Sequence, residues 1–184
     1  MNLYLSLVNN FYLKILKKYV IIYIESEEGG KQMLYILIGI PGSGKSTWAK
    51  RMAEESGAYW ISRDAIRFAK LKDEDDYFAY EDIVVDEFIS EIQNAIDDKY
   101  PIIIADATHL NYKSRNQLLS RLSLKGTSVV YVYFNTSLET ALKRNSKREG
   151  RAKVPNSVIE KMYNSIRLPT HYIKVEEDGE EEII

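Results

Sequence analysis

The feature that most constrains the fold of this chain is a glycine-rich loop at residues 39–46, with the sequence Gly-Ile-Pro-Gly-Ser-Gly-Lys-Ser. The loop matches every fixed position of the pattern G-x-x-x-x-G-K-[ST]. The apolar run at 34–38 is typical of a strand buried on both faces, and residues 45–56 have the pattern of a helix. A strand that turns directly into a helix points several backbone N–H groups at one spot. The sequence therefore predicts a phosphate-binding loop.

Strand-like and helix-like segments alternate along the rest of the chain. A capping box at 136–139 opens a helix that runs to Asn145, and Val158 to Ile166 form the apolar face of a last helix. This alternation indicates a parallel sheet covered by helices on both faces, which is a three-layer α/β fold. The other expected elements are strands at 59–62, 102–105, 127–134 and 172–175, and helices at 80–96 and 114–124.

The composition excludes several kinds of site. The 184 residues include no cysteine and only two histidines, His109 and His171. A disulfide scaffold and a thiolate metal site are therefore excluded, and the distance between the histidines in sequence argues against zinc. The net charge of −2 hides a segregation of charge, because six acids lie within 176–182 and six bases within 143–153. This distribution is compatible with a binding site for a polyanion.

Both ends of the chain differ in composition from its centre. Residues 1–32 are mostly apolar, but asparagines and lysines interrupt them too often for a membrane span, and no early basic region marks a secretory signal. We interpret them as an accessory helix and strand, an unstructured extension, or a translated leader ahead of a true start at Met33. Residues 33–175 are predicted to form one domain and 176–184 an acidic tail. A cytoplasmic protein without a membrane partner is expected.

Each part of the glycine-rich loop suits one part of a nucleoside triphosphate. The glycines let the backbone fold around phosphate groups, and Lys45 can reach the β- and γ-phosphates. The Ser46 hydroxyl suits a Mg²⁺ ion that keeps most of its waters. The alternative, a glycine-rich turn with an incidental lysine, does not account for the complete motif and its flanks. ATP and Mg²⁺ are the predicted cofactors. The residues expected at the nucleotide are Gly39, Pro41, Gly42, Ser43, Gly44, Lys45, Ser46 and Thr47.

A carboxylate follows the second predicted strand, in the sequence Ser-Arg-Asp-Ala-Ile-Arg at 62–67. Open α/β sheets bind ligands at the carboxyl ends of their strands. Asp64 is therefore a candidate general base for an attacking hydroxyl, and Arg67 is a candidate partner for an anionic group of the acceptor. The alternative is that Asp64 caps the following helix and pairs with Arg67 on the surface. The spacing of these residues does not decide between the two.

A second carboxylate, Asp106, follows the strand predicted at 102–105, and Thr108 and His109 come directly after it. In a protein with a phosphate-binding loop, such an aspartate resembles the acidic element that orients Mg²⁺ and its waters. The ordinary pKa of histidine lies near neutrality, but a lone histidine in a polar turn is more often a hydrogen-bonding loop residue. His109 is therefore not assigned as the base.

The basic segment at 143–153 lies near the end of a predicted helix and precedes Pro155. Its simplest interpretation is a solvated, charged turn. The alternative is a lid whose arginines take up the negative charge of a transferring phosphoryl group and exclude water. Arg144 and Arg148 are four residues apart, so on a helix they would share a face. We favour the lid because the chain also has a phosphate-binding loop.

These motifs together resemble the kinase domain of the phage 5′-hydroxyl polynucleotide kinase family, which acts in nucleic acid end healing. The resemblance covers nearly all of 33–167, in the order of that family. It implies a P-loop kinase fold with an arginine-bearing lid. The segments that carry it are 39–49, 62–67, 106–111 and 143–148, continued by Val154-Pro155 and Met162-Tyr163.

The resemblance also implies roles for the matching residues. Lys45 and Ser46 would contact the ATP phosphates and Mg²⁺, and Asp64 would be the general base on the 5′-hydroxyl. Arg148 and Arg144 would be lid arginines at the donor phosphates.

On the acceptor side, the resemblance implies that Arg67 binds a neighbouring phosphate with the assistance of Thr108. The family's strand-end motif is one residue shorter than Asp106-Ala107-Thr108, so either of the first two can match its acidic position. We choose Asp106, because only a carboxylate can do that work. A 3′-phosphatase activity is not expected, because no acid pair with room for a second domain follows Arg167.

The sequence thus predicts an ATP- and Mg²⁺-dependent phosphotransferase that acts on the 5′-hydroxyl ends of RNA or DNA. Lys45, Asp64 and Arg148 are its expected catalytic residues. One alternative is a kinase of the same architecture that phosphorylates a small-molecule hydroxyl of a nucleoside, a sugar nucleotide or an antibiotic. The other is an ATP-binding module without transfer chemistry.

Overall fold

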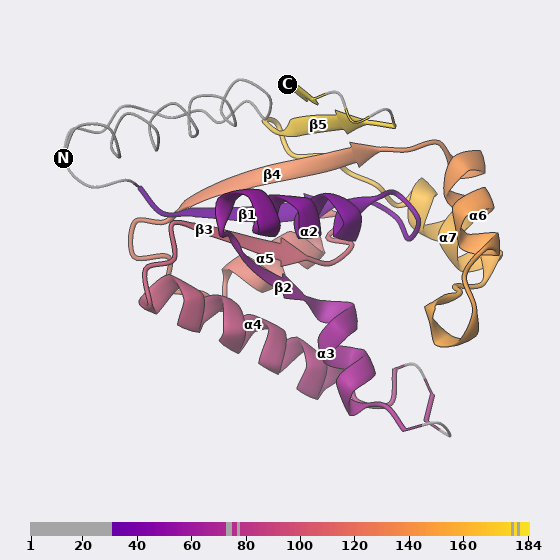
Figure 1. Cartoon of the computed structure of the whole chain (residues 1–184), viewed down its shortest axis with the longest axis horizontal. Coiled ribbons are helices and arrows are strands. Elements are labelled where there is room, and N and C mark those ends of the chain that lie inside the picture. Colours follow the sequence, from indigo (N-terminus) through magenta and orange to yellow (C-terminus); the bar gives the residue numbers. More distant parts are fainter. Residues whose placement is uncertain (1–30, 73–74, 77, 178, 180) are drawn as a thin grey trace.

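A six-stranded sheet forms the centre of the molecule (Figure 1). The computed structural model describes residues 31–72, 75–76, 78–177, 179 and 181–184. The strand order is β2-β3-β1-β4-β5-β6, and every neighbouring pair is parallel except β5 and β6. The strands are β1 (Met33–Ile38), β2 (Tyr59–Ser62), β3 (Ile102–Asp106), β4 (Ser128–Asn135), β5 (Ile173–Glu176) and β6 (Glu181–Ile183).

Helices cover both faces of this sheet, which confirms the predicted three-layer α/β architecture (Figure 1). On one face, α2 (Lys45–Ser56) packs Trp48 and Met52 against the sheet. On the other, α4 (Glu81–Asp97) and α5 (Tyr112–Leu119) form a second apolar cluster. The remaining helices are α3 (Arg63–Lys70), α6 (Leu138–Ser146), the short 3₁₀ helix η1 (Gly150–Ala152) and α7 (Asn156–Asn164).

The apolar run of β1 is continuous because both faces of this interior strand are buried. Leu34 and Ile36 belong to the cluster with α4, whereas Tyr35 and Leu37 belong to the cluster with α2. Successive side chains of a strand point to opposite faces, so a strand between two helical layers needs apolar residues at every position. The two layers place the carboxyl end of β1, and the loop that follows it, inside the molecule.

Two predicted helix starts are wrong, and side-chain caps explain both, while α5 also ends at Leu119, before the predicted end at 124. Helix α5 begins before Ser114 because Asn111 is its N-cap and accepts a hydrogen bond from the Ser114 N–H at 3.0 Å. Helix α6 is capped by Ser137, whose hydroxyl accepts from the Thr140 N–H at 3.2 Å. The predicted box began one residue earlier, at Thr136, but the Thr136 hydroxyl donates instead to the Ser43 carbonyl at 3.0 Å.

The acidic stretch at the end of the chain adds a strand to the sheet, where the sequence analysis expected a separate tail. Strand β6 pairs antiparallel with β5, and the Glu181 carboxylate accepts a hydrogen bond from Trp48 Nε1 of α2 at 2.9 Å. Glu177 accepts from the N–H of Ser137 at 2.6 Å. These acids bind specific donors of the domain, so they are not a solvated tail.

The interpretations of residues 1–32 fall almost entirely on 1–30, which lie outside the described residues. Within the described part, Gln32 joins the domain, because its side-chain amide donates to the Tyr100 carbonyl at 2.9 Å. No helix in that part of the chain is both long enough and apolar enough to cross a membrane.

Candidate active site

The phosphate-binding loop lies where β1 ends and α2 begins, as the sequence predicts. Gly42 and Gly44 have φ angles of +87° and +98°, a conformation that side chains strongly disfavour. A Cβ atom on Gly39 would lie 2.6 Å from Ser43 Oγ, and one on Gly42 would lie 2.7 Å from the Ala141 carbonyl oxygen. The loop can close this tightly only with glycine at these positions. Its backbone therefore suits an anion in the way a phosphate cradle requires.

Three other segments of the chain form hydrogen bonds with the phosphate-binding loop. The Gly39 N–H donates to the Thr108 carbonyl at 3.1 Å. The Thr136 hydroxyl binds the Ser43 carbonyl, and Arg144 Nη1 donates to the Gly42 carbonyl at 3.2 Å. Two residues expected at the substrates, Thr108 and Arg144, thus lie against the loop itself.

The Lys45 side chain is buried and lies along the loop. Its ammonium donates to the Ile40 carbonyl at 2.9 Å and to Ser43 Oγ at 3.3 Å. Burial lowers the pKa of Lys45 to about 8, although the nearby Asp106 and Asp64 carboxylates favour the charged form and Arg148 opposes it. Two neutral oxygens are weak compensation for a buried charge. An anionic phosphate in the loop would supply the missing partner.

Asp106 ends β3 beside the loop, and its carboxylate is buried. It accepts a hydrogen bond from Trp60 Nε1 at 3.2 Å, and the Ser46 hydroxyl lies close enough to affect its pKa. Burial raises the pKa of Asp106, while the neighbouring Lys45 charge and the Ser46 and Trp60 side chains oppose the rise. The structure thus brings Ser46 and Asp106 together, although they are sixty positions apart in the sequence.

The Ser46 and Asp106 oxygens fit Mg²⁺, which prefers oxygen ligands and keeps several of its waters. No group of three or more histidine, aspartate or glutamate side chains in the described ranges could form a complete protein cage for a metal. Ser46 would therefore hold the ion directly and Asp106 would orient its waters. When bound, Mg²⁺ neutralises charge on the transferring phosphates.

Asp64 and Arg67 form an ion pair at the carboxyl edge of the sheet, with Arg67 Nη1 2.6 Å from Asp64 Oδ1. The predicted alternative is wrong in two respects. Ser62, not Asp64, caps α3 by accepting from the Ala65 N–H at 3.2 Å. The pair is not on the surface either, because the Arg67 side chain is only 3% exposed, whereas that of Asp64 is 66% exposed. The Asp64 carboxylate is therefore exposed to solvent, although the arginine that it pairs with is buried.

Sequence reasoning missed Glu81, the first residue of α4. Glu81 Oε2 lies 2.6 Å from Arg67 Nη2, and Glu81 Oε1 lies 2.6 Å from Arg63 Nη2. Glu81 follows Arg67 by fourteen positions and begins a different helix, so no motif or helical spacing links the two in the sequence. The only available signal was a carboxylate at the start of a helix, which is common on any protein.

His109 lies at the same edge but is buried, and it does not have the predicted role of a side chain that hydrogen-bonds in a loop. Its ring packs 6.0 Å from the Phe88 ring, and its Nε2 has no hydrogen-bond partner among the described residues. Its φ angle of +40° is rare for a side-chain-bearing residue. Burial lowers the pKa of His109 to about 3, with smaller contributions from Arg63, Lys45 and Arg115. The imidazole is therefore neutral near pH 7, and its low pKa and its burial make it a poor base for a substrate hydroxyl.

Substitution His109→Asn is expected to remove part of the acid sensitivity of the fold. The unfolded chain protonates His109 near pH 6.5 and the folded protein only near 3, so the wild type loses stability as pH falls through this window. Urea unfolding at pH 7 and pH 4.5 should show a loss about 1 to 3 kcal/mol larger in the wild type than in the variant. Asparagine tolerates the positive φ angle. Substitution of the other, exposed histidine, His171→Asn, is the control, and an equal effect there contradicts the assignment.

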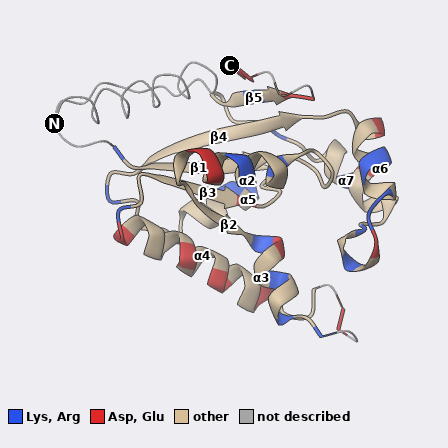
Figure 2. Ribbon diagram, in the orientation of Figure 1, with Lys and Arg blue, Asp and Glu red and all other residues tan. Residues whose placement is uncertain are grey.

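The predicted lid follows α6, but Arg144 and Arg148 do not share a helical face, because α6 ends at Ser146. Arg148 lies in the loop beyond it, where its Nη1 donates to the Ala152 carbonyl at 3.4 Å. Its charge still acts on Lys45, since it lowers the pKa of that ammonium. Figure 2 shows basic residues on α6 and on the loop after it, beside the edge of the sheet where the phosphate-binding loop lies.

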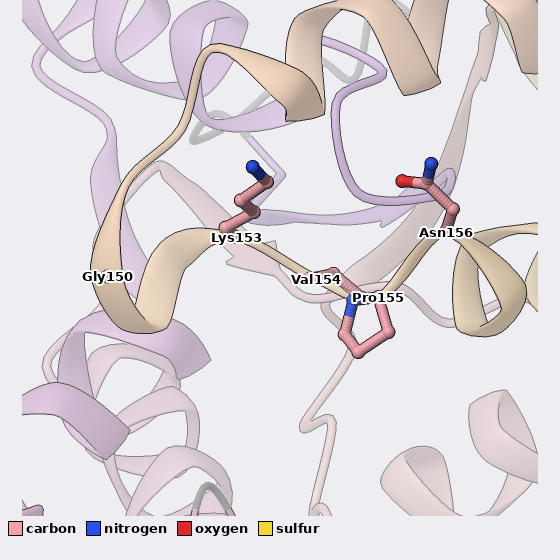
Figure 3. Close-up of a pocket in the computed structure, with 5 residues that line it drawn as sticks. All are labelled: Gly150, Lys153, Val154, Pro155 and Asn156. Atoms are coloured by element: carbon pink, nitrogen blue, oxygen red, sulfur yellow. The ribbon is translucent and has the colours of Figure 1, made fainter.

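Contacts at both ends fix the position of the loop that the sequence predicts to be a lid. The Asn145 side chain is fully buried and clamps Val154, accepting from its N–H at 3.0 Å and donating to its carbonyl at 2.7 Å. Arg151 donates to the Lys72 carbonyl, so the lid reaches the segment after α3. A hollow of about 490 Å³ lies along this loop, lined by Gly150, Lys153, Val154, Pro155 and Asn156 (Figure 3).

The structure therefore gathers a phosphate cradle, two carboxylates and several arginines at one edge of the sheet. Asp64, Asp106 and Arg148 all lie close enough to Lys45 to affect its pKa. Positive charge around a cradle stabilises a transferring phosphoryl group, and an exposed carboxylate nearby can accept a proton from an attacking hydroxyl. The arrangement suits phosphoryl transfer to a hydroxyl.

Known proteins that are similar to this chain include kinases. A family model described as an AAA domain matches residues 34–169. The L-seryl-tRNA(Sec) kinase of Methanococcus maripaludis is 33% identical over 144 residues, which cover 74% of this chain and 53% of that kinase. The chain thus spans about half the length of this curated relative.

Solved structures show the same fold. A chain in the structure of the Pnkp1/Rnl/Hen1 RNA repair complex has a TM-score of 0.65 at 26% identity, over 77% of this chain and 46% of that one. A sugar kinase from Janibacter has a TM-score of 0.57 at 21% identity, over 80% of this chain and 86% of that one. The second likeness shows the fold alone.

Proposed function

Because the chain belongs to the AAA domain family and has the fold of the P-loop kinases, we propose that it transfers the γ-phosphoryl group of ATP to the 5′-hydroxyl end of RNA or DNA. The observation that carries the proposal is the pair of Asp64 and Arg67 beside the phosphate-binding loop. The exposed carboxylate can receive a hydroxyl proton, and the arginine places positive charge next to it. An acceptor with an anionic group beside its hydroxyl fits this pair, and a nucleic acid end is such an acceptor.

In this mechanism the side chains of the chain divide the work between donor and acceptor. Lys45 and the backbone of the loop bind the β- and γ-phosphates, while Arg148 and Arg144 add positive charge from the lid. Asp64 takes the proton of the attacking hydroxyl, and Arg67 and Thr108 help to position the acceptor. Ser46 would hold Mg²⁺, and Asp106 beside it would orient the waters of the ion.

A second candidate acceptor is a hydroxyl carried on a tRNA. It is favoured by the 33% identity to a kinase named for seryl-tRNA, although this chain spans only about half of that kinase. The RNA repair complex and the seryl-tRNA kinase are both named for RNA, which supports an RNA acceptor over a free sugar.

An acceptor panel tests the proposal. With γ-labelled ATP and Mg²⁺, label transfer to oligonucleotides with a 5′-hydroxyl is expected to exceed that to 5′-phosphorylated controls by at least about 100-fold, because the control has no free nucleophile at that end. RNA and DNA oligomers are compared at equal length. Seryl-tRNA, nucleosides and gluconate complete the panel. Preferential labelling of seryl-tRNA favours the second candidate, and labelling of a nucleoside or gluconate alone contradicts both polynucleotide proposals.

A further inference from the structure

Glu81 of α4 pairs with both arginines of α3, Arg63 and Arg67. We propose that Glu81 is a positioning residue, which keeps the Arg67 guanidinium from closing on Asp64 with both of its terminal nitrogens. The inference deepens the proposed function and rests on the role of Asp64 in it.

Three ion pairs connect the residues into one chain of alternating charge. Asp64 pairs with Arg67, Arg67 with Glu81, and Glu81 with Arg63, and each pair is 2.6 Å long. Arg67 uses Nη1 for Asp64 and Nη2 for Glu81. Each of the two carboxylates thus binds a different terminal nitrogen of the Arg67 guanidinium.

The arrangement of the two carboxylates matters because the Arg67 side chain is buried. The Arg67 side chain is 3% exposed, so its charge depends on the carboxylates around it rather than on water. Glu81 stands at the start of α4, where the positive end of the helix stabilises a carboxylate. Val84 and Phe88 anchor the same helix on the sheet. The packing of α4 therefore fixes the position of Glu81, and the ion pairs of Glu81 orient the arginines of α3.

Without Glu81, the ion pair between Arg67 and Asp64 remains among those described. An arginine and a carboxylate prefer the bidentate arrangement, in which two parallel N–H groups bind the two oxygens. Arg67 would then engage Asp64 through both nitrogens and turn the carboxylate from solvent toward the interior. A carboxylate held in this way is poorly placed to accept a proton from an acceptor hydroxyl.

Crystal structures of the wild type and the Glu81→Ala variant test this directly, whatever the acceptor is. We expect Arg67 to contact both oxygens of Asp64 in the variant and one oxygen in the wild type. If Arg67 contacts Asp64 through Nη1 alone in both structures, the inference is wrong.

Steady-state kinetics test its consequence with whichever acceptor of the panel the wild type uses. In Glu81→Gln we expect kcat to fall about tenfold, since the acceptor of the Arg67 hydrogen bond loses its charge, while KM for ATP stays unchanged. Glu81→Asp, which keeps the charge, should recover most of the lost rate. The matched control is Glu87→Gln, which removes another ion pair between α4 and α3, the one to Lys70. It should have wild-type kinetics.

The two proposals fail in different ways. If the wild-type protein labels only seryl-tRNA, a nucleoside or gluconate, the proposal of a 5′-hydroxyl acceptor is refuted. The role of Glu81 can still be tested with the acceptor that is labelled. Glu81→Gln with wild-type kcat refutes the positioning role, even where 5′-hydroxyl ends are the substrate. Thermal unfolding and ATP binding are measured for each variant. An equal loss of rate in Glu81→Gln and Glu87→Gln also refutes the positioning role, because it shows a general weakening of the contact between α3 and α4.

Discussion

Replacement of Asp64 by alanine is expected to abolish phosphoryl transfer while ATP still binds. General base catalysis contributes about 10² to 10⁴ in rate, and no other carboxylate described at this edge combines exposure with a position near Lys45. Asp106 is buried and accepts a hydrogen bond from Trp60, so it cannot take over the role. Single-turnover transfer of label from ATP measures the chemical step, and calorimetric titration with a non-hydrolysable ATP analogue measures donor binding.

The chain offers a close control for this variant. Asp86 of α4 is also 66% exposed and also pairs with an arginine, Arg121, at 2.8 Å. Asp86→Ala therefore removes an equally exposed carboxylate and a similar ion pair far from the phosphate-binding loop in the chain, and it should keep wild-type activity. Arg67 retains Glu81 as a partner in Asp64→Ala, so the variant should fold. Turnover of Asp64→Ala within about tenfold of the wild type would refute the assignment of Asp64 as base.

Replacement of Lys45 by methionine is expected to reduce transfer by at least about 100-fold and to weaken ATP binding, because the ammonium compensates the charge of the β- and γ-phosphates. Lys50→Met, on an exposed position of the same helix, is the control and should bind ATP normally. Direct titration of ATP and single-turnover transfer are the measurements. Unchanged ATP affinity in Lys45→Met would place the triphosphate elsewhere.

The same Lys45→Met substitution should stabilise the nucleotide-free protein. Burial holds the pKa of Lys45 at about 8, against 10.5 in the unfolded chain, so the unfolded chain binds more protons between these two values. Wild-type stability therefore rises with pH from about 8 to 10.5, and the variant lacks this rise. At pH 7 we expect the variant to gain about 2 kcal/mol in free energy of unfolding, measured by urea denaturation. A lower free energy of unfolding in the variant would show that burial of the Lys45 charge does not destabilise the wild type.

Local patterns predicted most of the elements. The run at 34–38 is strand β1, and helix α2 covers the predicted residues 45–56, because an apolar run, a glycine loop and helical periodicity are all properties of adjacent residues. The boundaries of α5 and α6 were less predictable, because several residues there can serve as the cap. Thr136 is a good capping residue by type, yet its hydroxyl holds Ser43, ninety-three positions away.

The sequence by itself determined the strand, the phosphate-binding loop and the helix that follows, since these depend on neighbours in the chain. Only the tertiary structure decided which charged groups meet at the edge of the sheet. It buried His109, brought Ser46 near Asp106, and paired Glu81 with Arg67. It also converted the acidic end of the chain into a strand that binds Trp48. Such contacts join residues of separate elements. Their geometry depends on how the helices pack on the sheet, and the spacing of residues along the sequence does not reveal that packing.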